Sequence, residues 1–184
     1  TGNDPVVPNV TALRELMVQP FPLFLLLLPF LATFGGILIN WYTENTVTLL
    51  TLAIASVVPL YMYWADVDTR LYPLALWAVG LTLLLQNSVI LTYLMDGDGT
   101  KEYLFAKFYL QQGVWQPGAI SDLKNTMLRL VFVHPAYVRL LNIPMLWEFK
   151  IVHPLLFSLT PVALYSFYRR SFADTTALLG AFLY

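Results

Sequence analysis

The sequence has no cysteine and few charged side chains. Without a thiol in its 184 residues, disulfides, thiolate metal sites and cysteine nucleophiles are excluded. Only 11% of the residues are charged, whereas soluble domains have about 25%. The net charge of -1 gives no basic excess, so nucleic acid is not an expected partner. The sequence also lacks a Gly-rich phosphate loop, a Ser-His-Asp arrangement and a nucleotide fingerprint.

Hydrophobic residues make up 58% of the chain and are gathered into long runs. A helix needs about 20 apolar residues to cross a bilayer core. The runs at 21–39, 46–63, 71–94 and 151–167 have about this length, and 177–184 resembles the beginning of another. We therefore expect an all-α, polytopic protein embedded in a lipid bilayer, with about four full spans and the start of a fifth.

These runs divide the chain into four segments. We expect a polar N-terminal segment at 1–18, three spans within 19–94, a long loop at 95–150, and the fourth span with the start of a fifth at 151–184. Because the chain begins without methionine and ends inside an apolar run, it is expected to be the N-terminal part of a longer protein.

The cationic residues of the short loops predict the orientation. The turn after the first run contains neither Lys nor Arg. Arginines occur in the N-terminal segment, after the second run and after the fourth run, at Arg14, Arg70, Arg169 and Arg170. This alternation predicts a multi-pass protein, in the plasma membrane, with a cytoplasmic N-terminus and an external loop at 95–150.

That external loop is too long for a structureless connection, so we expect it to fold. Residues 101–112 are predicted to form a helix that ends at Gly113. Residues 121–133 are predicted to form a second helix, which His134-Pro135 interrupts. Short amphipathic helices with interfacial aromatic residues are typical of a membrane surface.

The loop opens with three acidic residues, Asp96, Asp98 and Glu102. If a helix begins near Gly99, Asp98 and Glu102 lie about one turn apart and can point the same way. Such a pair can supply a general base or hold a hard divalent cation such as Mg²⁺ or Mn²⁺. The same residues also fit an ordinary polar turn with a helix cap. A calcium loop is excluded because its further ligands are missing.

The two histidines of the chain, His134 and His153, each precede a proline and lie 19 residues apart. This is not a metal-ligand spacing such as His-x-x-x-His, so structural hydrogen bonding is the preferred interpretation of each. Glu148 and Lys150, close to the fourth run, are expected to face water at the interface.

A resemblance to a known superfamily adds to this interpretation. The segment Asp98-Gly99-Thr100-Lys101-Glu102-Tyr103, followed by Gly113-Val114-Trp115, resembles the Asp…Glu-Tyr…Gly-x-Trp pattern in the first large external loop of GT-C glycosyltransferases. Trp147-Glu148-Phe149-Lys150-Ile151 and the following Pro154-Leu155-Leu156-Phe157-Ser158-Leu159 are similar to an archaeal family of uncharacterised multi-span proteins. The likeness extends from Asp96 to about Arg170.

The resemblance implies a membrane glycosyltransferase that takes its sugar from a polyprenyl-phosphate donor at the outer membrane face. It implies that Asp98 is the catalytic base or, with Glu102, a ligand of a divalent metal. Asp96 is the alternative candidate for the role of Asp98. The expected substrate-binding residues are Lys101, Tyr103, Arg129 and His134.

The alternative is a non-catalytic membrane scaffold or a transporter fragment whose external loop binds a partner or a lipid headgroup. Transport pathways usually need ionisable residues inside the spans. The first, second and fourth predicted spans have none in their middles, which disfavours ion coupling but not a scaffold.

Overall fold

The computed structural model describes residues 10–65, 67–90, 97–114, 127 and 129–183, and this part of the chain is helical without a strand. The predicted all-α class is therefore confirmed. Within it, four helical stretches are long and apolar enough to cross a membrane: Pro20–Tyr42, Thr46–Trp64, Thr69–Val89 and Met145–Tyr168. Their lengths of 19 to 24 residues suit a bilayer core that needs about 20.

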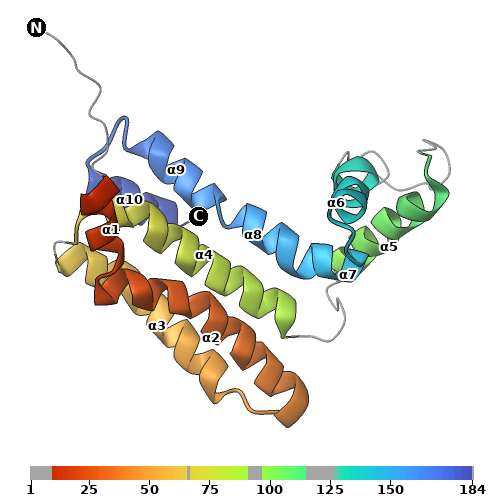
Figure 1. The fold of residues 1–184 in the computed structure, drawn as a ribbon, viewed down its shortest axis with the longest axis horizontal. Helices are drawn as coiled ribbons and strands as arrows, with labels where there is room; N and C mark the ends of the chain where they lie inside the picture. The colour runs from red at the N-terminus through yellow and green to blue at the C-terminus, as the bar shows by residue number, and fades with distance from the viewer. Residues whose placement is uncertain (1–9, 66, 91–96, 115–126, 128, 184) are drawn as a thin grey trace, which may run out of the picture.

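The first three stretches form an antiparallel bundle. After the short α1 (Val10–Met17), α2 (Pro20–Tyr42) and α3 (Thr46–Trp64) run in opposite directions, and α4 (Tyr72–Val89), entered through the 3₁₀ turn η1 (Thr69–Leu71), lies beside α2 (Figure 1). Prolines lie inside α2 and α3, as membrane helices tolerate.

Two adjacent glycines of α2 bring the bundle close together. A Cβ on Gly35 would lie 2.7 Å from Oγ1 of Thr48 on α3, and one on Gly36 would lie 3.3 Å from main-chain atoms of Val89 and Ile90. Small residues at such contacts let membrane helices approach at main-chain distance. The Gly35-Gly36 pair therefore fixes α2 against both of its neighbours.

The fourth stretch runs back along α4 and is built from several helical pieces: α7 (Met145–Trp147), the π-helical η4 (Glu148–Val152), α8 (His153–Phe157) and α9 (Thr160–Tyr168). It begins six residues earlier than the predicted run at 151–167. The following α10 (Asp174–Phe182) turns back and packs on α9 and α4. The predicted start of a fifth span falls in α10.

The loop helices α5 (Gly97–Gln112), η3 (Arg129–Val133) and α6 (His134–Leu141) lie at the end of the bundle opposite α1 and α10 (Figure 1). The predicted helix at 101–112 is confirmed, with a start four residues earlier. Its predicted end is also confirmed, because Gly113 has the positive φ of 70° that glycine adopts readily.

The interruption predicted at His134-Pro135 is wrong. The π-helical η3 passes directly into α6, and Val133, the last residue of η3, has helical dihedral angles. Proline sits in the first turn of α6, where its missing N–H is tolerated. Most of the predicted helix at 121–133 lies outside the described residues.

Two apolar cores hold these parts. The larger one joins α2, α3, α4, α9 and α10 around residues such as Leu28, Leu76 and Leu178. A smaller one joins α5, α6, α7 and η4 through Ala106, Val138, Met145 and Phe149. This second core attaches the loop helices to the start of the fourth span and positions the candidate site.

Candidate functional site

Two short π-helical turns, η3 and η4, frame the candidate site. Each is followed directly by a His-Pro pair, His134-Pro135 after η3 and His153-Pro154 after η4. Proline has no main-chain N–H, so it cannot donate the bond that an α-helix makes to the carbonyl four residues earlier. Single π-helical turns of this kind are frequent at functional sites.

The turn η4 decides which side chains of the fourth span share a face. The N–H of His153 donates to the carbonyl of Glu148, five residues earlier. In an α-helix, residues five apart point about 140° away from each other. A π-helical turn closes between these two positions and brings them near one another. η4 therefore presents Glu148 and His153 on one side of the helix.

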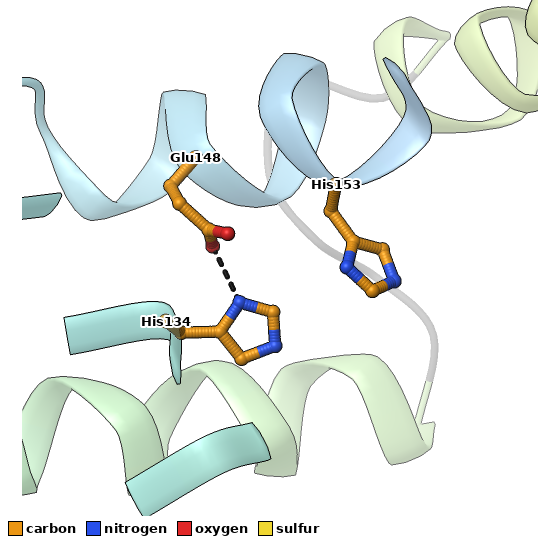
Figure 2. A group of neighbouring side chains, drawn as sticks. All are labelled: His134, Glu148 and His153. Atoms are coloured by element: carbon orange, nitrogen blue, oxygen red, sulfur yellow. Dashed lines mark hydrogen bonds and ion pairs between the residues drawn. The ribbon is translucent and has the colours of Figure 1, made fainter. Parts of the chain in front are cut away.

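His134 of α6 faces this pair. Figure 2 shows Glu148 pointing from the fourth span at His134, and His153 extending from the same side of that span. Nδ1 of His134 lies 2.7 Å from a carboxylate oxygen of Glu148, and the two imidazole centroids are 5.3 Å apart. One donor atom from each residue lies within 4.8 Å of the other two. The fold thus gathers three potential metal ligands from two helices.

The His134–Glu148 pair is deeply buried, since each side chain is only 1% exposed. An ionised carboxylate only accepts hydrogen bonds, so with Glu148 ionised Nδ1 of His134 carries the proton and donates it. In the neutral ring Nε2 then presents a lone pair, and this atom has no hydrogen-bond partner among the described residues. Buried polar atoms without partners are rare in folded proteins, and each needs an explanation.

Aromatic rings wall the cluster. The ring of Phe149 stacks on His134 with centroids 4.2 Å apart, and the ring of Phe157 lies 4.2 Å from His153. The buried ring of Phe149 replaces water beside His134, and the lower local dielectric strengthens the hydrogen bond between the buried pair.

The expectation that Glu148 and Lys150 face water is wrong. Lys150 is 5% exposed and Glu148 is 1% exposed, because the fourth helical stretch begins at Met145 and packs its first turns against the loop helices and α4. The hydroxyl of Ser88 on α4 donates to the carbonyl of Lys150 at 2.8 Å. Pro154 cannot donate to that carbonyl, so Ser88 stabilises the proline-adapted turn.

The helix α5 reaches the cluster through one predicted site residue, Tyr103. The ring of Tyr103 meets Phe149 edge-on with centroids 5.8 Å apart, and Phe149 in turn stacks on His134. Glu102 is half-buried and Lys101 is exposed.

Asp98 lies inside the first turn of α5, four residues before Glu102, so the two positions share one face of the helix. Asp96 and the side chains of Asp98 and Arg129 lie outside the described residues. The roles assigned to all these residues stay predictions.

Sequence reasoning missed Glu148 and His153 as members of a joint site with His134. A spacing such as His-x-x-x-His detects ligands on one α-helix, whereas this cluster joins two helices and depends on a π-helical turn. The available signal was the pair of His-Pro dipeptides, with Glu148 five residues before the second histidine.

Comparisons of the chain with protein-family models, with curated proteins and with solved structures found no match. Any function must therefore be inferred from the residues of the site.

Proposed function

We propose that this chain belongs to a membrane glycosyltransferase that transfers a sugar from a polyprenyl-phosphate donor at the outer face of the plasma membrane. The observation that carries the proposal is the docking of α5, with its Asp98 and Glu102 positions one turn apart, against the start of the fourth span. The two carboxylate positions of α5 thus lie at the end of the membrane bundle, on a helix that packs beside the buried His134–Glu148 pair.

The geometry suits a reaction at the membrane edge. A polyprenyl tail is soluble in the bilayer, and its phosphate and sugar lie at the headgroup level. Asp98 would accept the proton of the acceptor hydroxyl as this oxygen attacks the anomeric carbon. The bond between that carbon and the phosphate oxygen breaks, and polyprenyl phosphate leaves. Glu102 would support Asp98 by orienting it or by sharing a divalent metal such as Mg²⁺ or Mn²⁺.

The remaining predicted residues have roles that fit this reaction. Lys101, exposed on α5, and Arg129 would attract the donor phosphate, and Tyr103 would form a wall beside the sugar. His134 is too buried to touch solvent, so we propose that it acts by fixing α6 to the fourth span through Glu148. Functional groups need such a rigid support.

The orientation belongs to the same proposal. Arg14 and Arg169 lie near the end of the bundle that carries α1 and α10, and α5 lies at the other end (Figure 1). Under the positive-inside rule, this arrangement supports a cytoplasmic N-terminus and an external α5.

Sugar transfer in membranes tests the proposal. Membranes containing the chain are incubated with polyprenyl-phosphate mannose and, separately, polyprenyl-phosphate glucose, each labelled in the sugar. We expect label to move into a lipid-free acceptor fraction. Asp98→Asn should lower the rate at least 100-fold, since general bases typically contribute 10²- to 10⁴-fold.

Glu15→Gln is the matched control, because Glu15 is an exposed carboxylate on α1 at the opposite end of the bundle. Transfer by Asp98→Asn at the rate of Glu15→Gln would refute the catalytic assignment. No transfer from either donor by the wild-type chain, in membranes that hold it folded, would count against this donor class.

A transporter is the second candidate, and one observation favours it. Glu148, Lys150 and His153 are ionisable residues within the fourth candidate span, and such residues often mark ion or proton pathways. Proteoliposomes with a pH-sensitive dye inside test this candidate. Proton flux that Glu148→Gln abolishes would support transport, and flux equal to that of empty vesicles would exclude it.

A further inference from the structure

We propose that His134, Glu148 and His153 form a binding site for a divalent transition-metal ion. This site is separate from the acidic positions of α5, and it stands whether or not the chain transfers sugar. Two imidazoles and one carboxylate are the protein groups of many catalytic zinc sites and of non-haem iron sites.

The spacing of the donor atoms is close to what such an ion needs. Zinc binds imidazole nitrogen and carboxylate oxygen at about 2.0–2.2 Å, so donors around a tetrahedral ion lie roughly 3.3 Å apart. The donor atoms of the cluster lie within 4.8 Å of one another. Closing the site therefore requires movements of about 1.5 Å at most, which side-chain rotations supply.

Nε2 of His134, which has no hydrogen-bond partner within the described part of the chain, is an independent sign of a ligand. This atom is buried, and its ring is held from the other side by Glu148. Metal-binding histidines almost always donate their second N–H to a carboxylate, a carbonyl or water, and a carboxylate partner raises the basicity of the ring. The same three side chains form the site in either of two arrangements. Glu148 binds the ion directly, or Glu148 accepts the hydrogen bond from Nδ1 of His134 while Nε2 of His134 binds the ion.

The charges of the cluster also suit a cation. Glu148 supplies the negative charge that partly neutralises a divalent ion, and the imidazoles bind it in their neutral form. The buried ring of Phe149 stacks on His134 and excludes water from that side. Coordination positions that the three side chains leave open would take water or an oxygen of a substrate.

Zinc titration of the full chain tests the proposal. The protein is purified in detergent with a chelator, freed of the chelator, and titrated with zinc chloride in a calorimeter. We expect one zinc ion per chain. Glu148→Gln and His153→Gln should each weaken binding at least tenfold, since even residues that only orient a metal ligand affect metal affinity by 10- to 100-fold.

Two further variants are titrated in the same way. Glu15→Gln removes an exposed carboxylate at the other end of the bundle and should bind zinc as the wild type does. Asp98→Asn removes a carboxylate position of α5 and separates binding at the cluster from binding at α5. Thermal unfolding of each variant shows whether it is folded. His134 is fully buried, and its variants can fail to fold for that reason. The His153→Gln variant then tests the proposal, because His153 is only half-buried.

Wild-type protein that binds no zinc beyond the detergent blank would overturn the proposal. Zinc binding that His153→Gln and Glu148→Gln leave unchanged would also overturn it, and loss of binding only in Asp98→Asn would assign the ion to α5 instead.

Discussion

Removing one member of the His134–Glu148 pair should destabilise the protein far more than removing both. Each side chain is 1% exposed and their polar atoms are 2.7 Å apart. Glu148→Leu leaves a buried imidazole N–H without an acceptor, which costs about 1–3 kcal/mol. His134→Leu leaves a buried carboxylate without its donor, and breaking a buried charged pair in this way costs about 3–5 kcal/mol.

The double variant replaces both polar groups by apolar ones of similar size. Such a replacement is often nearly neutral, so we expect its free energy of unfolding to lie within roughly 1–2 kcal/mol of the wild-type value. The coupling energy between the two sites should therefore be at least about 2 kcal/mol.

Unfolding in detergent provides the measurement. The protein is unfolded by titration with sodium dodecyl sulfate, in the presence of a chelator, and followed by tryptophan fluorescence. Trp147 precedes Glu148 in the chain and reports on this region. Glu15→Leu is the matched control, because it makes the same substitution at an exposed site. If the two single-variant costs add up to the cost of the double variant within about 0.5 kcal/mol, the coupling is refuted.

Three further predictions concern the scaffold. Gly35→Val should lower the free energy of unfolding by about 1–3 kcal/mol through overpacking, because a Cβ added to Gly35 would lie 2.7 Å from Oγ1 of Thr48. An unchanged denaturation midpoint would contradict this contact. Ser88→Ala should cost about 1 kcal/mol by removing the 2.8 Å hydrogen bond to the fourth span, and the same titration measures it.

The side-chain and main-chain hydrogen bonds from Arg70 lower the pKa of Asp68. A lowered carboxyl pKa stabilises the fold above the unfolded value and loses this effect as the pH falls through the folded value. Asp68→Asn should therefore be less stable than the wild type at pH 7, and the difference should disappear as the pH falls below the lowered pKa of the folded Asp68. A difference that persists after Asp68 is protonated in the folded protein would exclude this linkage.

The membrane helices could be predicted from composition because their signal is local. In lipid, a single run of about 20 apolar residues satisfies the hydrogen bonds of its own main chain by forming a helix. The runs at 21–39 and 46–63 correspond to α2 and α3. The end of α5 was equally local, since glycine at position 113 is suited to the left-handed turn that follows a helix.

The cluster could not be predicted because it depends on two non-local facts. The π-helical turn η4 rotates His153 onto the face of Glu148, and the small core around Val138 and Phe149 packs α6 against that face. Neither is visible in the spacing of the histidines. The same core explains why Glu148 and Lys150 are buried although they precede the most hydrophobic part of the fourth span.

Nitrogen NMR of the two imidazoles tests the central claim most directly, namely that His134 and His153 share one buried site with Glu148. The chain has only two histidines, so selective ¹⁵N labelling gives two assignable rings. We predict that His134 holds its proton on Nδ1, that Glu148→Gln shifts this resonance, and that zinc shifts the nitrogens of both rings. Two rings with the shifts of free, solvent-exposed imidazole, unaffected by Glu148→Gln and by zinc, would contradict the account.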